Sequence, residues 1–183
     1  AIGVDASRYS LARTDYNTSV DIDLDLLASH SNDNPVYYVQ YAHARSCNVA
    51  RNAADAGITQ DGADLSLLNT ETDGEVLAAL AQWPAALAQA GDLRAPHRVA
   101  HYLEDLAASY HKWYNLERVV PMELTDPENR LPEAEREAQR IAKCPEPARA
   151  AARLKLNAAV RTVIATGLDL LCLLYTSDAA DER

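Results

Sequence analysis

The segment from Asn34 to Arg45, Asn-Pro-Val-Tyr-Tyr-Val-Gln-Tyr-Ala-His-Ala-Arg, constrains the local fold more than any other part of the chain. Pro35 suits the first position of a helix, where its missing N–H is not needed, and the side chain of Asn34 can cap the free amides of the first turn. Gly57 provides a stop at the other end. The sequence therefore predicts a helix over residues 35–56.

The predicted fold class is all-α. The 183 residues include only 6 glycines and 8 prolines, and alanine-rich segments with few β-branched residues favour helices. Further helices are expected over residues 2–13, 71–90 with a break at Pro84, 96–121, 133–143 and 147–171. In residues 19–26 apolar and acidic residues alternate, which predicts a half-exposed edge strand. We therefore expect a helical bundle with a short α/β segment near the N-terminus.

Size and charge restrict the possible functions. A chain of 183 residues and 20.0 kDa suits one well-packed domain. The formal net charge of −10 and the pI near 4.9 argue against a protein that grips nucleic acid with its whole surface. Local groups of Arg and Lys can still contact phosphates while the acidic remainder repels RNA from other faces. The same acidity favours an alternative, a helical protein-interaction module that does not bind RNA.

The sequence also indicates where such a chain works. No apolar run reaches the roughly 18 to 20 residues that cross a bilayer, and the N-terminus lacks the features of a signal peptide. We expect a cytoplasmic monomer without membrane contact. Cys47, Cys144 and Cys172 have no metal-like spacing, so reduced thiols are expected.

Two groups of potential metal ligands are set aside. The aspartates that alternate through the expected strand lack the downstream glycine and glutamate of a calcium loop; they are Asp21, Asp23 and Asp25. His97, His101 and Asp105 recur at four-residue spacing, but three ligands from one straight helix rarely converge on one ion. No metal is expected, and the helix surface that carries Arg98 and His101 is more readily placed near RNA.

Several segments resemble one family. Residues 34–45 resemble the signature that opens the anticodon-binding domain of bacterial arginyl-tRNA synthetases. Residues 3–9 and 20–24, and the helical segments 101–115 and 152–161, resemble other parts of these enzymes in the same order. The resemblance covers residues 1–171. It implies a helical anticodon-binding domain over residues 31–171, preceded at residues 1–30 by a remnant of the stem that joins it to a class I catalytic domain.

The resemblance also implies partners and an activity. The intact enzyme would join arginine to an arginine tRNA using ATP and Mg. The HIGH-type and KMSKS-type motifs, whose His and Lys groups stabilise charge during nucleotide chemistry, do not occur in this sequence. We therefore expect the protein's own catalytic domain to lie outside this sequence, no catalytic residue or cofactor within it, and no activity for the chain alone.

Within the signature helix, Tyr37, Tyr38 and Tyr41 can stack on unpaired bases, an interaction worth about 1 to 3 kcal/mol per base. Tyr37 and Tyr41 share one face. The alternative is that Tyr37, Tyr38 and Tyr41 belong to the core. Polar contacts to RNA or to the catalytic domain are expected from Gln40, His43 and Arg45. Further candidates for RNA contacts lie on the later helices; they are Lys112, Arg118 and Arg153. For Lys112 and Arg118 the alternative is a solvated surface charge. Three later aromatic residues are expected mostly to pack in the interior; they are Tyr110, Trp113 and Tyr114.

Residues 172–183 depart from the family. Back-translation of Cys-Leu-Leu-Tyr-Thr-Ser-Asp-Ala-Ala-Asp-Glu, which begins at Cys172, gives a nucleotide sequence that resembles the transposase adapter used in sequencing libraries. We therefore expect a non-native tail from Cys172 onward.

Overall fold

The computed structural model describes residues 3–121, 132–143, 145–173 and 175. In chain order, its elements are α1 (Val4–Ala12), α2 (Leu24–Ala28), α3 (Pro35–Asp55), the 3-10 helix η1 (Leu65–Leu67), α4 (Glu71–Ala81), α5 (Trp83–Asp92), α6 (His97–Leu116), α7 (Glu133–Lys143) and α8 (Pro147–Leu170). The described residues form helices and no strand, so the predicted all-α class is confirmed. Among these helices, none has a segment both long and apolar enough to cross a bilayer.

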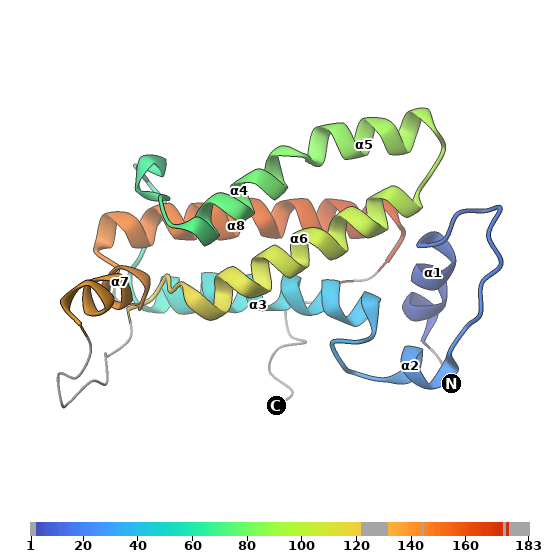
Figure 1. Ribbon diagram of the computed structural model, residues 1–183, viewed down its shortest axis with the longest axis horizontal. Coiled ribbons are helices and arrows are strands. Elements are labelled where there is room, and N and C mark those ends of the chain that lie inside the picture. The colour runs from blue at the N-terminus through green and yellow to red at the C-terminus, as the bar shows by residue number, and fades with distance from the viewer. Residues whose placement is uncertain (1–2, 122–131, 144, 174, 176–183) are drawn as a thin grey trace.

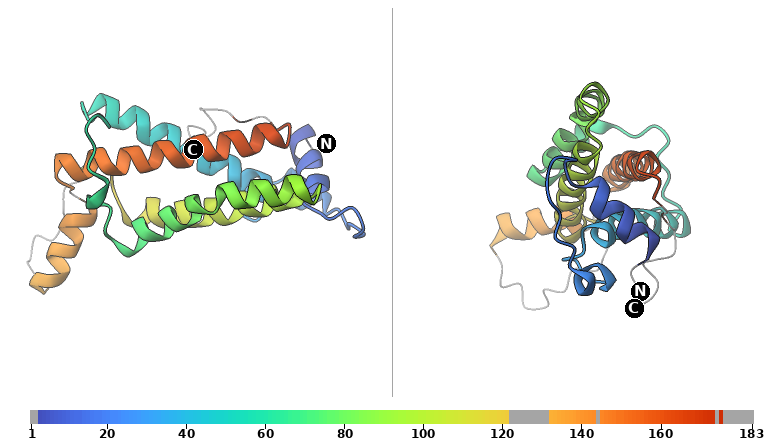
Figure 2. Two further views of the ribbon diagram at one scale, coloured as in Figure 1. Left: turned by 90° about the horizontal axis from the view of Figure 1, so that it is seen from above. Right: turned by 90° about the vertical axis from the view of Figure 1, so that its right-hand side faces the viewer.

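The helices form an elongated bundle around α6 (Figure 1). α6 packs against α1, α3, α4, α5 and α8, and α3 also packs against α8. Two further views show α1 and α2 at one end of the bundle and α7 at the other (Figure 2). The central position of α6 means that its side chains determine how the remaining helices are spaced.

Proline and capping residues set several helix boundaries where they were predicted. α3 begins at Pro35. Pro84 lies in the first turn of α5, and the predicted break separates that helix from α4. At the start of α4, Thr70 and Asp73 form a reciprocal capping box.

The predicted role of Asn34 is wrong in detail. Asn34 occupies the N-cap position of α3, but its side chain makes no capping hydrogen bond. Its amide instead donates to the carbonyls of Leu27 and Ser29, at 3.2 and 2.8 Å. The side chain therefore fixes the connection between α2 and α3 rather than the first turn of α3.

The predicted edge strand over residues 19–26 is also wrong. Residues 19–23 have no regular structure, and the short helix α2 begins at Leu24. The carboxylate of Asp23 accepts from the amides of Asp25 and Leu26, both at 3.0 Å, and so starts a helix in the middle of the expected strand. Val20 and Ile22 are exposed, because no described strand lies beside this segment to pair with it.

The N-terminal segment is fastened to the bundle through α1. Tyr9 is buried, and its hydroxyl lies 3.1 Å from the carbonyl oxygen of Ala100 and 3.0 Å from Oε1 of Glu104. Arg13 donates two hydrogen bonds to the same carboxylate, at 2.6 and 3.1 Å. Burial and the neighbouring Glu104 raise the pKa of Tyr9 far above its usual range, so its hydroxyl stays protonated.

The three cysteines and the expected tail are covered only in part. Cys47 and Cys172 are free thiols, as predicted. Cys144 lies outside the described residues, and so do residue 174 and residues 176–183 of the expected tail. The predicted division at residues 30 and 171 remains a prediction.

The core lies where α3, α6 and α8 meet. Tyr110 and Trp113 are buried, as predicted, whereas Tyr114 is half-buried. The fully buried Asn157 of α8 joins all three helices, because it accepts from the Tyr110 hydroxyl at 2.7 Å and donates to the carbonyl of Ser46 at 2.9 Å. This bridge fixes the rotation of α6 relative to α3.

Close packing accompanies that bridge. Gly167 of α8 faces the buried side chain of Leu103 on α6. A Cβ atom at Gly167 would lie only 2.6 Å from Leu103 Cδ2, so the two helices approach more closely than an alanine would allow without movement of Leu103.

Arg153, predicted as an RNA contact, is wholly buried, and this prediction is corrected. Its guanidinium donates to the carboxylate of Glu117 and to the carbonyls of Arg118, Ile141 and Ala142, at 3.0, 3.1 and 2.8 Å. Burial lowers the pKa of Arg153, and the nearby carboxylates oppose that shift. The side chain therefore connects α8 to the end of α6 and to α7.

Two buried carboxylates extend this cluster into α4. Asp73 Oδ1 lies 3.9 Å from Nε of Arg153 and accepts from the indole N–H of Trp113 at 2.8 Å. Glu117 accepts from the hydroxyl of Thr72 at 2.9 Å. We refer to Arg153, Glu117, Asp73, Thr72 and Trp113 as the buried polar cluster.

Replacement of Arg153 by Met should destabilise the fold severely. The substitution leaves the carboxylates of Glu117 and Asp73 buried without their cation, which costs about 3 to 5 kcal/mol. Urea titration followed by circular dichroism measures this loss. Lys155→Met on the same helix is the control, since Lys155 is exposed and its replacement should change the free energy of unfolding by no more than about 0.5 kcal/mol. Equal stabilities for the two variants would contradict the structural role of Arg153.

Candidate nucleic-acid interface

Three side chains of α3 follow one another at four-residue spacing, which places Tyr37, Tyr41 and Arg45 on one face of the helix. The rings of Tyr37 and Tyr41 stack with their centroids 5.7 Å apart and their planes 9° apart. His30, from the connection between α2 and α3, continues this stack on Tyr37 with a centroid separation of 5.6 Å. The sequence thus builds a line of parallel rings that ends at a cation.

The guanidinium of Arg45 lies against two aromatic rings. Its Cζ is 4.4 Å from the ring centroid of Tyr41 on α3 and 4.7 Å from that of Tyr114 on α6. Arg118 also lies over the Tyr114 ring, with Cζ 5.6 Å from the centroid. These distances are within the range of cation–π attraction. We call the six residues the stacked row; they are His30, Tyr37, Tyr41, Arg45, Tyr114 and Arg118.

His111 of α6 supports the row from the interior. Its Nδ1 lies 3.0 Å from Nη1 of Arg45, and its Nε2 lies 3.2 Å from the carbonyl oxygen of Tyr38. Because a guanidinium can only donate, Nδ1 accepts and Nε2 carries the hydrogen that it donates to Tyr38. The imidazole therefore holds Arg45 in place only while it is neutral.

The environment of His111 maintains this neutral form. Burial lowers its pKa to about 4; the hydrogen bond to Tyr38 opposes that shift and the charge of Arg45 adds to it. At neutral pH His111 therefore adds no charge beside the guanidinium of Arg45. Burial likewise raises the pKa of Tyr38.

A small cavity adjoins the Tyr114 end of the row. Its volume is about 80 Å³, and its lining includes Tyr114, Arg118 and Asn52. Trp113 and Val49 provide apolar surface in the same cavity. This end of the row therefore borders a small cavity that combines aromatic surface with the polar groups of Arg118 and Asn52.

The structure separates the other predicted contacts from the row. Gln40 donates to the carboxylate of Asp5 in α1 at 3.2 Å, so it connects α3 to the N-terminal segment. His43 is buried, with its ring against the C-terminal segment. Lys112 is exposed and forms an ion pair with Glu75 at 2.6 Å. Arg153 belongs to the buried polar cluster and is not exposed to a ligand.

Sequence reasoning missed three parts of this surface. Tyr114 was expected mostly to pack internally, although its spacing of four residues from Arg118 was a readable signal for a stacked pair. His30 and His111 were not singled out, and their contacts with α3 depend on tertiary packing. No sequence pattern pointed to Asn52.

The interface offers binding groups rather than reactive ones. In the part of the chain that the structure describes, no group of three or more His, Cys, Asp or Glu side chains is placed to hold a metal ion. The stacked row presents aromatic rings and two guanidinium groups, and Asn52 adds an amide in the adjoining cavity. Such groups bind planar bases and phosphates.

Comparisons with known proteins agree on one family. The DALR anticodon binding domain family matches residues 39–175. The chain is 82% identical over 171 residues to arginine–tRNA ligase of Bifidobacterium adolescentis, and 52% identical over 172 residues to that of Kineococcus radiotolerans. Each match covers 93% of this chain, and the chain spans about 28% of the length of these curated relatives.

A solved structure shows the same arrangement. The Thermus thermophilus arginyl-tRNA synthetase aligns with a TM-score of 0.67 and 30% identity, over 94% of this chain and 26% of the synthetase chain.

The free energy of unfolding should depend on pH through His111. The unfolded state binds the proton with an ordinary pKa near 6.5, whereas the folded state has a pKa of about 4. The stabilisation is therefore complete above pH 6.5 and is lost as the pH falls toward 4. Between pH 7 and pH 4.5 the wild-type chain should lose about 2 to 3 kcal/mol more than His111→Gln. The glutamine side chain can accept from Arg45 and donate to Tyr38 but does not titrate. Urea unfolding at both pH values measures the difference, and parallel losses would contradict a neutral buried imidazole.

Proposed function

Because the chain belongs to the family of DALR anticodon-binding domains, we propose that it is the tRNA-recognition part of an arginine–tRNA ligase and that the stacked row binds the RNA. The stacked row carries this proposal. It places planar rings and two guanidinium groups along a half-buried surface shared by α3 and α6. Unpaired bases of an anticodon loop present the flat faces that such rings stack upon.

The row is organised before RNA binds. Tyr41 and Tyr114 come from different helices, and the guanidinium of Arg45 between them holds their separation. The neutral His111 fixes the guanidinium without neutralising its charge. A base that stacks on such a surface loses less free energy to the ordering of protein side chains.

The acidic charge of the chain fits this localised mode of binding. With a net charge of −10, most of the surface repels RNA, whereas Arg45 and Arg118 attract it to the row. The long-range repulsion and the short-range attraction together restrict the orientation in which RNA can approach. We infer that specificity for one face follows from the charge distribution as well as from the rings.

The intact enzyme would use ATP and Mg to activate arginine and then transfer it to an arginine tRNA. The present chain would contribute binding and orientation of the tRNA. α1, held by Tyr9 and Arg13 against α6, and joined to α3 by Gln40, would transmit the position of the bundle to the catalytic domain of the same protein. A monomer in the cytoplasm fits this role, since aminoacylated tRNA is used there by ribosomes.

Salt-dependent tRNA binding tests the proposed surface against the alternative of a protein-interaction module. Tyr41→Ala should weaken the binding of an arginine tRNA transcript by about 1 to 3 kcal/mol with little change in salt slope, because it removes a stacking surface. Arg45→Gln should lower the salt slope by about one unit, as for one lost phosphate contact. Filter binding across a salt series measures both quantities, with circular dichroism to show that each variant is folded.

The contact between Tyr41 and Arg45 predicts the tRNA affinity of the double variant. Because the ring and the guanidinium touch, the double variant should lose less affinity than the sum of the single losses. Lys155→Gln is the control for charge, since Lys155 is exposed on α8. If the wild-type chain shows no salt-dependent tRNA binding, the alternative of a protein-interaction module is favoured. If both single variants bind tRNA with the affinity and salt slope of the wild type, the stacked row is not part of the interface.

The chain alone should not catalyse arginine-dependent exchange of pyrophosphate into ATP, with or without tRNA. The sequence contains neither a HIGH-type nor a KMSKS-type motif to stabilise the charge that develops on the α-phosphate. The measurement is radiolabelled exchange, with a full-length bacterial arginyl-tRNA synthetase as the positive control. Exchange above the blank would show that nucleotide chemistry resides in residues we assign to binding.

A further inference from the structure

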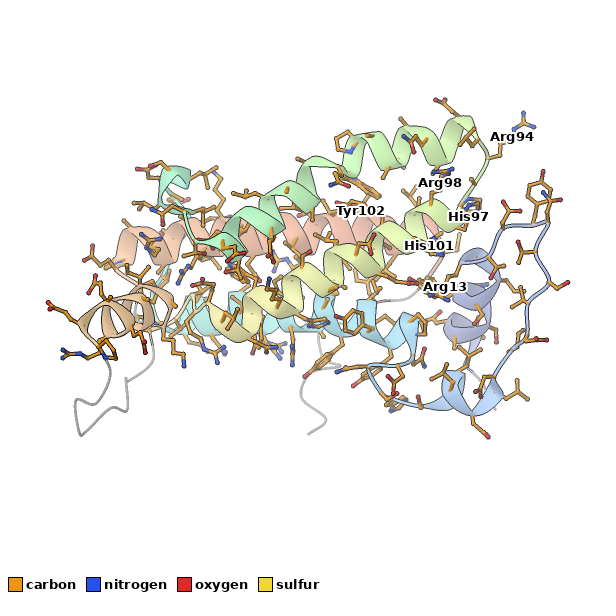
Figure 3. The ribbon with its side chains drawn as sticks, in the orientation of Figure 1. Arg13, Arg94, His97, Arg98, His101 and Tyr102 are labelled. Atoms are coloured by element: carbon orange, nitrogen blue, oxygen red, sulfur yellow. The ribbon has the colours of Figure 1, made fainter. Side chains whose placement is uncertain are left out.

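The corner at which α5 meets α6 gathers basic side chains at the end of the bundle near α1 (Figure 3). We call Arg94, His97, Arg98 and His101 the basic corner. Arg94 and Arg98 are exposed, as is His101, and the ring of His97 contacts that of His101 at a centroid separation of 6.0 Å. None of these residues belongs to the stacked row or to the buried polar cluster.

Arg94 occupies a backbone conformation that does not suit it. Its φ is 51°, in the left-handed region that favours glycine. The conformation closes α5, because the amide of Ala95 reaches back to the carbonyl of Ala90 at 2.9 Å. Glycine at residue 94 would make the same turn without strain. Arg94 therefore makes this turn less stable than glycine would.

The N-terminal turn of α6 is an unfavourable place for positive charge. The first turn of α6 contains no acidic residue, whereas α4 begins with Glu71 and Asp73. Cations near a helix N-terminus are disfavoured by the helix dipole, which instead favours an anion there. Arg98 thus carries its positive charge where the helix dipole favours a negative group.

Neighbouring carboxylates leave this charge largely uncompensated. Glu104 is engaged by Arg13 at 2.6 Å. Among the described residues, no ion pair joins Arg94 or Arg98 to a carboxylate; Arg98 donates instead to the neutral amide of Gln89 at 3.3 Å. Asp92 and Asp105 are the remaining acidic residues nearby in the sequence, and both are exposed to solvent.

We propose that the basic corner binds phosphodiester groups of the RNA whose bases are held by the stacked row. This inference rests on the proposed function. Guanidinium groups match the geometry of phosphate oxygens. Arg98 and Tyr114 are 16 residues apart on α6, which corresponds to about 24 Å along the helix. The corner therefore contacts a stretch of RNA backbone distinct from the bases at the row.

The first test measures tRNA affinity against salt concentration for Arg94→Gln/Arg98→Gln in the full chain. Loss of two phosphate contacts should lower the salt slope by about 1.4 to 1.8 units and weaken binding at low salt. Lys155→Gln is the matched control for the loss of exposed positive charge and should keep the wild-type slope. A wild-type slope in the double variant overturns the inference and leaves the corner to an acidic protein partner.

Arg94→Gly provides a second test in which stability and binding change in opposite directions. Removal of the side chain from the left-handed position should raise the unfolding midpoint by about 2 to 4 °C, whereas loss of the contact should lower the salt slope by about 0.7 to 0.9 units. Arg94→Lys should keep the slope, because it retains the charge. A purely structural role for Arg94 would leave RNA binding unchanged in the glycine variant.

The outcomes separate this inference from the proposed function. If the wild-type chain does not bind tRNA, both fail. A second outcome is that the wild-type chain binds and that Tyr41→Ala weakens binding, while the variants of the basic corner behave like the wild type. That outcome overturns only the inference about the basic corner. Reduced slopes in the corner variants beside unchanged behaviour of Lys155→Gln would support both.

Discussion

The buried guanidinium of Arg153 joins α8 to three other parts of the chain. It neutralises Glu117 at the end of α6, approaches Asp73 in α4, and donates to the carbonyl of Arg118 and to two carbonyls near the end of α7. A buried ion pair is not stabilising merely because it exists, since each charge loses its hydration. Here the carboxylates are also satisfied by Trp113 and Thr72. Replacement of any one member of the cluster therefore lowers the stability of the fold. The cluster in this way favours a single relative arrangement of α4, α6 and α8.

That arrangement is a precondition for the candidate interface. Trp113 contributes its indole N–H to the buried polar cluster, while the next residue, Tyr114, contributes its ring to the stacked row. His111 and Tyr110 lie one turn earlier, where His111 positions Arg45 and Tyr110 connects α6 to Asn157. A single stretch of α6 thus directs one set of side chains into the core and another set toward α3. Any rotation of α6 that disturbed the buried polar cluster would also separate Tyr114 from Arg45.

The sequence was informative where local chemistry determines the outcome. Pro35 and Pro84 set helix boundaries because their rings restrict the backbone in any context, and four-residue spacing alone placed Tyr37 and Tyr41 on one face. It failed where the outcome depends on distant partners. The alternation of residues 19–26 describes a strand only if another strand pairs with it, and the charge of Arg153 gives no indication of the two carboxylates that bury it. His30 and His111 could not be assigned to the candidate interface for the same reason, because their neighbours come from other elements.

Arginine illustrates why composition alone underestimates what such a chain can bind. The net charge of −10 averages over residues in three different environments. Arg153 is paired with carboxylates inside the core, Arg45 lies between two aromatic rings that order it without neutralising it, and Arg94 is exposed on a strained turn. A cation stacked on a ring keeps its full charge for a phosphate, whereas a cation paired with a carboxylate does not. The attraction for RNA therefore depends on how many guanidinium groups the fold keeps away from carboxylates, and an acidic chain can retain that attraction on one surface while its remaining charge repels RNA elsewhere.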